Sequence, residues 1–305
     1  MQSLKRAIKY LITDRLQFCD SFVKNVLSFL PDRLYLSLRF RCQMGTWINW
    51  KNPTTFSEKL QWLKVYNRRP EYTKMVDKYA VKQYVADLIG KEYIIPTLGV
   101  WDSPELIDWE ALPNQFVLKT TNGGGGNGVV ICQDKSSLDK TAAANKMKTS
   151  LKSNIYKTLR EWPYKNVTKR IIAEELLVPS DGDLKDYKVL CFNGKAKLIE
   201  YHSGRFSDNH TQDIYDQEWN LTDITQSEYG EISHNMVDKP EFLNEMLDLS
   251  EKLAAGIPHV RVDWYNCENR LYFGEITFFD GSGLVKFDKI EHELMLGSWI
   301  DCGKV

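Results

Sequence analysis

The spacing of apolar residues at the start of the chain predicts helix. Over residues 4–30 the apolar positions recur every three or four residues, which predicts one long or two short amphipathic helices that end at Pro31. Two interpretations of this stripe are open. It packs on the rest of the protein, as most such stripes do, or it lies on the surface near anionic lipid or a lipid-carried substrate.

Two further helices are predicted before residue 91. Thr55 and Glu58 have the spacing of a capping box, so a helix should begin there and run to about residue 66. A third helix is predicted over 73–89 and should end at Gly90, because glycine adopts the left-handed conformation that commonly follows a helix.

The remainder of the chain reads as mixed strand and helix. Short apolar runs separated by turn residues predict strands, and two longer segments, near 136–159 and 238–256, predict helices. The order is a helical leader followed by an α+β region, without an internal repeat. The predicted strands are 93–101, 115–121, 128–133, 170–178, 187–192, 195–201, 260–265 and 271–279.

Composition and charge narrow the class of protein. The chain has 305 residues, 43% hydrophobic and 27% charged, which is typical of a folded protein. The formal net charge of -1 argues against a general nucleic-acid binder. Residues 1–50 carry eight basic and three acidic side chains, so the leader has a local charge of +5.

Cysteine usage and the absence of export signals predict a cytoplasmic protein. The six cysteines are scattered, without a CxxC pair for metal or redox chemistry. The N-terminus lacks the continuous apolar core of a signal peptide, and no stretch approaches the roughly 20 apolar residues of a membrane span. The basic leader leaves open a peripheral contact with the inner face of the membrane.

A glycine-rich loop over 122–128 lies between two predicted strands, and packing alone gives no reason for it. Its glycines formally satisfy GxGxxG, but that motif requires a following helix, and no Lys-Ser or Lys-Thr follows as in a Walker A loop. We interpret it as a hairpin flap whose backbone amides approach phosphate oxygens, with Lys119 as a fixed cation. The alternative is a disordered surface loop.

A second candidate site is a hairpin over 261–277. Alternation places Arg261 and Asp263 on one face, with Phe273, Glu275 and Thr277 on the same face of the partner strand. A turn centred on residue 269 sets Asp263 opposite Glu275 and Arg261 opposite Thr277. Two carboxylates this close favour a shared divalent cation over the alternative, in which both simply face water.

Three weaker signals lie between these sites. Glu174 and Glu175 follow a strand, at a natural place for a hinge that meets an adenine and a ribose. Lys188, on a strand that leads to a predicted Asn-Gly turn at 193–194, is either a phosphate-binding cation or, more commonly, an exposed strand lysine. The DGD segment at 181–183 fits a DxD metal motif for a sugar nucleotide, but it is also a good turn.

Taken in order, these motifs resemble the ATP-grasp fold, in which two α+β subdomains enclose ATP. More closely, the chain is similar to the TupA-like ATP-grasp family, which is associated with teichuronopeptide and surface-polysaccharide biosynthesis. The resemblance spans roughly residues 45–290. The segments that carry it are TTFSEKLQWLK, VDKYAVKQYV, FVLK with TNGGGGNG, AEELL, DYKVLCFNGK, RVD and GEITFFDGSG.

The resemblance implies a nucleotide site and a division of the chain. The implied regions are a helical N-terminal region over 1–72 and two ATP-grasp subdomains over 73–175 and 176–305. Family enzymes commonly have Glu-x-Asn where this chain has Glu275-Ile-Thr277. The implied roles are ATP binding by Lys78, Lys119, Gly124, Gly125, Gly126, Asn127, Glu174, Glu175 and Lys188, Mg²⁺ binding by Asp263, Glu275 and Thr277, and catalysis by Arg261 and Arg205.

The chemistry implied by the family is ligation. A carboxylate attacks the γ-phosphate of ATP, an acyl phosphate forms, and an amine displaces phosphate. The implied substrates are a carboxylated sugar or sugar nucleotide of the uronic-acid type and an amino acid, used in capsule or O-antigen biosynthesis. The alternatives are a kinase on the same fold, a glycosyltransferase that uses Asp181 and Asp183, and a nucleotide-binding assembly protein without enzymatic activity.

Overall fold

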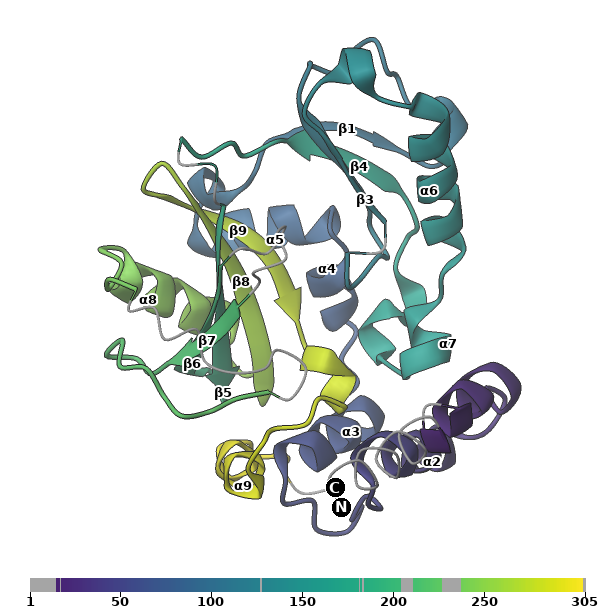
Figure 1. Cartoon of the computed structure of the whole chain (residues 1–305), viewed down its shortest axis with the longest axis vertical. Helices are drawn as coiled ribbons and strands as arrows, with labels where there is room; N and C mark the ends of the chain where they lie inside the picture. The colour runs from purple at the N-terminus through teal and green to yellow at the C-terminus, as the bar shows by residue number, and fades with distance from the viewer. Residues whose placement is uncertain are drawn as a thin grey trace, which may run out of the picture.

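The strands form two antiparallel sheets. The computed structural model describes residues 15–303 except 17, 127, 181, 183, 204–210 and 227–236, and its two sheets have the strand orders β1-β4-β2-β3 and β7-β6-β5-β8-β9 (Figure 1). Every predicted strand is present, and β7 is added to them. The strands are β1 Thr97–Trp101, β2 Phe116–Thr120, β3 Val129–Cys132, β4 Ile171–Glu175, β5 Lys185–Phe192, β6 Lys195–Ser203, β7 Thr211–Tyr215, β8 His259–Cys267 and β9 Arg270–Thr277.

Helices precede and flank the sheets. Residues 18–26 are helical, and 3-10 turns η1 to η5 add to the α-helices. In the described ranges, no helix has both the length and the apolar composition that a membrane span requires. The helices are α2 Asp32–Met44, α3 Phe56–Tyr66, α4 Tyr72–Val76, α5 Ala80–Ile89, α6 Lys140–Lys152, α7 Ile155–Leu159, α8 Leu243–Leu253 and α9 Ile290–Ser298, and the turns are η1 Lys91–Tyr93, η2 Pro104–Leu106, η3 Lys135–Ser137, η4 Trp162–Asn166 and η5 Asp280–Gly283.

The local signals set some helix boundaries and miss others. The capping box of α3 is present: the Glu58 amide donates to the Thr55 side chain at 3.2 Å, and the Glu58 carboxylate accepts from the Thr55 amide at 3.2 Å. The single helix predicted over 73–89 is wrong. It is two helices, because the Asp77 carboxylate accepts from the amides of Tyr79 and Ala80 and so caps a new helix, α5.

Helices cover the outer face of each sheet. Met147 of α6 packs on Leu118 and Ile171 of the four-stranded sheet, and Met246 and Leu249 of α8 belong to the larger core of the five-stranded sheet. The inner faces of the two sheets therefore look toward each other, with α4 between them (Figure 1). Lys119, Glu174, Lys188, Arg261, Asp263 and Glu275 of the predicted candidate residues lie on these inner faces.

The helical region at the start of the chain is not a separate layer. Side chains of α3 such as Phe56 and Leu60 belong to the core of the five-stranded sheet, whereas α2 forms a third cluster around Tyr35 and Phe40 with Val23. The division of the chain at residues 72 and 175 therefore stays a proposal. The predicted leader residues 4–14 lie outside the described residues.

Candidate active site

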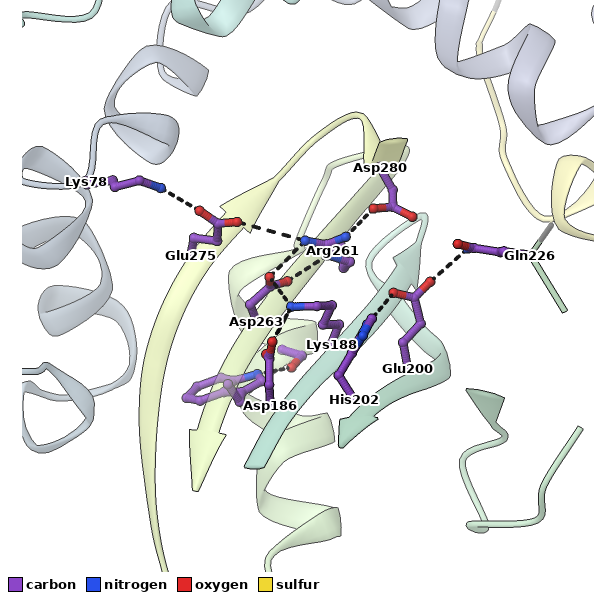
Figure 2. A network of polar contacts seen from close by, with 12 residues as sticks. Lys78, Asp186, Lys188, Glu200, His202, Gln226, Arg261, Asp263, Glu275 and Asp280 are labelled. Carbon is purple, nitrogen blue, oxygen red and sulfur yellow. Dashed lines mark hydrogen bonds and ion pairs between the residues drawn. The ribbon is translucent and has the colours of Figure 1, made fainter. Parts of the chain in front are cut away.

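Four charged residues form a row across four adjacent strands of the five-stranded sheet. The backbone register pairs Glu200 of β6 with Lys188 of β5, Lys188 with Asp263 of β8, and Asp263 with Glu275 of β9. Directly paired residues point to the same face of a sheet, so these side chains share the inner face (Figure 2). Glu200 was not among the predicted site residues.

The β8–β9 hairpin brings the predicted carboxylate pair together through a tight turn and a bulge. Glu268 and Asn269 form the turn with φ of 53° and 56°, and Cys267 pairs with Arg270. The register then shifts at Gly274, where a side chain would bring its Cβ within 3.1 Å of the Asp263 carbonyl oxygen. Asp263 faces Glu275 as predicted, because the bulge restores the pairing that a turn centred on residue 269 would give.

The same bulge makes one predicted position wrong. Phe273 pairs with Trp264 and is buried in the core, on the face opposite to Glu275, because the extra residue at Gly274 interrupts the alternation of side chains. Thr277 lies opposite Arg261, as predicted.

Arg261 connects the carboxylates of this face. Its Nε and Nη2 atoms donate to the two carboxylate oxygens of Asp263 at 2.7 and 2.8 Å, and its third nitrogen contacts Asp280. Glu275 lies 3.9 Å from Nη2. Burial alone would lower the pKa of Arg261, but the charges of Asp263 and Asp280 raise it well above its ordinary value, so Arg261 stays positive.

Lys188 is buried between two carboxylates. Its Nζ atom donates to Asp186 at 2.8 Å and to Asp263 at 2.9 Å. The interpretation of Lys188 as an exposed strand lysine is therefore wrong. Burial raises the pKa of Asp263, but Arg261 and Lys188 oppose this more strongly and hold it below its ordinary value, so Asp263 is ionised at neutral pH.

Two lysines one helical turn apart connect α5 and the segment before it to both sheets. Lys78 forms an ion pair with Glu275 at 2.5 Å, whereas Lys82 contacts Glu174 of the four-stranded sheet. Lys119 also pairs with Glu174, at 2.6 Å. Lys82 was missed by the sequence analysis, although its spacing of four residues from Lys78 is a signal that could have found it.

The adjacent residues Glu174 and Glu175 differ in environment because side chains alternate along a strand. Glu174 is buried and Glu175 is exposed. Burial raises the pKa of Glu174, but the nearby charges of Lys119 and Lys82 outweigh this effect and lower it. Glu174 is therefore a charged partner of two lysines, whereas Glu175 contacts neither of them in the described structure.

The glycine loop has a packed base and an open tip. A Cβ at Gly128 would lie 2.1 Å from the Ser150 hydroxyl, and one at Gly123 would lie 2.7 Å from the Thr120 hydroxyl. Gly125 and Gly126 adopt positive φ angles of 61° and 74°, and a Cβ on either would meet nothing within 4 Å. The expectation that packing plays no part is wrong for the base and holds for the tip, where backbone amides can reach a ligand.

Two buried polar residues of α3, Gln61 and Lys64, hold the turn that carries Asp280, and neither was predicted as a site residue. The η5 turn over 280–283 has left-handed φ at Ser282, whose carbonyl oxygen accepts from Gln61 at 2.9 Å and from Lys64 at 2.8 Å. Lys64 is fully buried, and burial lowers its pKa to about 7 although Glu161 opposes the shift. Helix α3 therefore fixes the turn that presents Asp280 to Arg261.

Glu200 has polar neighbours at the far end of the row. Gln226 donates to Glu200 at 3.2 Å, and the Nε2 atom of His202 lies 3.7 Å from its carboxylate (Figure 2). Burial raises the pKa of Glu200, with Arg261 and Lys188 opposing the shift. The predicted Arg205, Asn127, Asp181 and Asp183 lie outside the described residues.

Asp263 and Glu275 supply part of the set of ligands that a hard cation such as Mg²⁺ needs. Asp263 and Glu275 both have pKa values below their ordinary range, because nearby cations outweigh burial, so both supply charged oxygens on paired strand positions. Within the described ranges, no group of three or more His, Cys, Asp or Glu residues could hold a metal ion. A metal here would need further ligands from the substrate, as Mg²⁺ in phosphate sites usually does.

Comparisons with known proteins place these observations in a family. The sequence model described as TupA-like ATP-grasp matches residues 58–301. No curated protein matches the chain. The family and the ATP-grasp fold expected from the sequence are confirmed by the family match.

Similar solved structures are ligases of low identity. D-alanine–D-alanine ligase from Helicobacter pylori is 18% identical, with a TM-score of 0.43 over 80% of this chain and 69% of that one. The Bacillus anthracis D-alanine–D-alanine ligase is 16% identical, with a TM-score of 0.40 over 67% and 57%. The ATP-grasp ligase PsnB, complexed with minimal precursor, Mg and ADP, is 13% identical, with a TM-score of 0.38 over 82% and 65%. This chain thus spans less than two thirds of the last two.

Proposed function

Because this chain belongs to the TupA-like ATP-grasp family, we propose that it is an ATP-dependent carboxylate–amine ligase. The observation that carries the proposal is the charged inner face of the five-stranded sheet, where Lys188, Asp263 and Glu275 lie in one row beside Arg261. Each of these charges is paired within the protein, as a buried charge must be. Well-packed apolar residues would usually stabilise this face as much as the ion pairs do, so folding alone gives no reason for the charges.

Cations from both sheets would hold the triphosphate. Lys78 reaches the inner face of the five-stranded sheet, and Lys119 lies on β2 of the four-stranded sheet, on the strand that leads into the glycine loop. The open amides of Gly125 and Gly126 would cover the phosphates. Phosphate oxygens would replace Glu275 and Glu174 as partners of the lysines.

Asp263 and Glu275 would hold Mg²⁺, which would neutralise charge on the triphosphate. Both carboxylates are already ionised in the described state, so no proton has to leave before a cation binds. Thr277 would add a neutral oxygen beside them. Lys188 would keep Asp263 oriented through the contact at 2.9 Å.

The reaction would proceed in two steps. A carboxylate oxygen of the first substrate attacks the γ-phosphorus, the bond to the ADP oxygen breaks, and an acyl phosphate forms. The amine nitrogen of the second substrate then attacks the carbonyl carbon, the bond to phosphate breaks, and the amine loses a proton. Arg261, which stays positive, would stabilise charge on the transferred phosphoryl group, and we keep Arg205 as a second candidate for this role.

The substrates that we propose follow from the family. The acid would be a uronic-acid-type sugar or sugar nucleotide and the amine an amino acid, in capsule or O-antigen biosynthesis on the cytoplasmic side. A kinase would use the same nucleotide site. Against the glycosyltransferase, Gly182 has a φ of 76° and its amide donates to the Pro179 carbonyl at 3.0 Å, which favours a turn at Gly182.

The test is to trap the activated acid. The full chain is incubated with ATP, Mg²⁺, hydroxylamine and a panel of uronic acids, and hydroxamate, ADP and phosphate are measured. A ligase forms hydroxamate and releases ADP and phosphate, because an acyl phosphate reacts with hydroxylamine. A stable phosphorylated sugar without hydroxamate would indicate the kinase, and release of AMP would contradict attack at the γ-phosphate. A sugar nucleotide that stabilises the protein better than Mg²⁺-ATP would favour the glycosyltransferase.

A further inference from the structure

The helical segment over 18–26 presents apolar residues on two faces. Val23 faces the cluster formed with Leu36 and Phe40 of α2 and is 5% exposed. Phe18 and Phe22 lie one turn apart on another face and are 73% and 48% exposed. Packing on the protein therefore accounts for only part of the stripe predicted from the sequence.

The exposed face is larger than this one helix. Val26 and Phe29 continue it, with exposures of 51% and 78%, and Leu34 and Trp47 of the following segment are 48% and 57% exposed. Phe18, Phe22 and Val26 are neighbours through their four-residue spacing, and exposed apolar side chains gathered in this way mark an interaction surface. We call Phe18, Phe22, Val26 and Phe29 the apolar edge.

Exposed basic side chains lie on the same helical segment as the apolar edge and on α2 beside it, and the acidic ones of these segments are already neutralised. Asp20 pairs with Arg39 at 2.7 Å, inside the cluster, and Asp32 pairs with Arg160 at 2.9 Å. Among the described residues, the ion pairs of Asp20 and Asp32 are with Arg39, Arg68 and Arg160 and leave the exposed bases of this region without a carboxylate partner. Those bases are Arg15, Lys24, Arg33 and Arg41.

The segment is fixed to the rest of the protein. Arg160, which follows α7, donates to the carbonyl oxygens of Ser28 at 2.6 Å and Leu30 at 3.3 Å, and the Tyr35 hydroxyl donates to the Thr158 carbonyl at 2.7 Å. The purple end of the chain lies at the periphery, beyond α7 and away from both sheets (Figure 1). A surface that bound the apolar edge would not cover the candidate active site.

From this arrangement we infer that the apolar edge and the exposed bases of the same segments form a docking surface for an anionic phospholipid bilayer. Aromatic side chains enter the boundary between headgroups and acyl chains, and the surrounding bases contact acidic headgroups. A second copy of the chain is a poorer occupant, because a symmetric contact would bring the same positive charges together. The proposal is independent of the ligase reaction.

The test is co-sedimentation of the full chain with phosphatidylcholine vesicles, with and without phosphatidylglycerol, over a series of salt concentrations. We expect binding that requires phosphatidylglycerol and weakens as salt rises. Lys24→Gln should weaken binding about fivefold. Phe22→Ser/Phe29→Ser should weaken it at least about tenfold.

The matched control is Leu106→Ser/Val178→Ser, which changes two apolar residues outside the edge that are 61% and 55% exposed. It should bind vesicles like the unmodified chain. Thermal unfolding checks that the Phe22/Phe29 variant is folded. If it is not, the salt series and Lys24→Gln still test binding to the vesicles. Absent binding, binding that ignores lipid charge and salt, an equal loss in the control, or a dimer that the Phe22/Phe29 variant abolishes would overturn the inference.

Discussion

The substitution Asp263→Asn tests whether the charged row serves the reaction. It removes one negative charge and changes the shape of the side chain little. Asp263 is 2% exposed and accepts from Arg261 at 2.7 and 2.8 Å and from Lys188 at 2.9 Å. An asparagine has one acceptor oxygen, so its amide group would face the donors of Arg261 or Lys188.

The loss of stability can be bounded from these contacts. Breaking a buried ion pair by removing one partner destabilises a protein by about 3–5 kcal/mol. Arg261 keeps Asp280 and Lys188 keeps Asp186, so we expect the lower end, about 3 kcal/mol, and a melting temperature lower by about 6 °C. Since the folded pKa of Asp263 is lowered, its contribution to stability is present at neutral pH and is lost as pH falls through that pKa.

The assay compares turnover with stability. ATP turnover by Asp263→Asn should fall by at least about 100-fold, because a ligand of the Mg²⁺ that neutralises the triphosphate is lost. Asp186→Asn is the matched control: it also removes a carboxylate from Lys188, at 2.8 Å, but from outside the row. It should lose stability and keep most turnover. Normal turnover by folded Asp263→Asn, or equal losses in both variants, would refute the reasoning.

Three further predictions use other parts of the site. Lys119→Ala should stay folded and lower ADP release about 100-fold, and full activity would remove Lys119 from the phosphate site. Gly128→Ala should be less stable to denaturant than Gly126→Ala. A Cβ at residue 128 would lie 2.1 Å from the Ser150 hydroxyl oxygen, whereas a Cβ at residue 126 would meet open space and be disfavoured only by the φ of 74°. The opposite order would contradict the packed base. Burial lowers the pKa of Lys64 from 10.5 to about 7. Between pH 7 and 10.5 the unfolded chain therefore binds more protons than the folded protein, and the free energy of unfolding should rise with pH. Lys64→Met should flatten this rise.

The elements with strong local signals were predictable from the sequence. The Asn193-Gly194 turn forms with φ of 49° and 79°, as the dipeptide predicts. Alternation in β8 correctly put Arg261 and Asp263 on one face. These signals work because turn dihedrals and the two-residue repeat of a strand are set by neighbouring residues alone.

The row of Glu200, Lys188, Asp263 and Glu275 depends on two β-bulges, and the sequence does not show where they lie. A regular hairpin through Asn193-Gly194 would set Lys188 opposite Ile199, but the register shift after Leu190 sets it opposite Glu200. In the second hairpin the shift at Gly274 has the same effect on Glu275. Each bulge moves the pairing by one residue and so exchanges the two faces of the strand. A glycine in the strand is a hint, but it does not fix the place of a bulge.

Helix α2 could not be predicted from the spacing of its apolar residues either. Its inward face holds Tyr35, Leu36 and Phe40 together with Arg39, which is buried because Asp20 neutralises it. A charged residue in the middle of the buried face breaks the apolar pattern, so this helix was not predicted. The partner that makes Arg39 acceptable comes from another segment, and pairing of this kind cannot be read from spacing.

The contrast between the two faces of the five-stranded sheet bears on function. The outer face carries Val189, Val262 and Trp264, which pack under α8 and contribute to the hydrophobic core. The inner face of the same strands carries Lys188 and Asp263, whose burial requires the partners described above. Because well-packed apolar residues usually stabilise a protein as much as buried ion pairs do, stability alone gives no reason for the charges. A site that binds phosphate and a cation does give a reason, and it explains why the charges lie on the face that looks toward the other sheet.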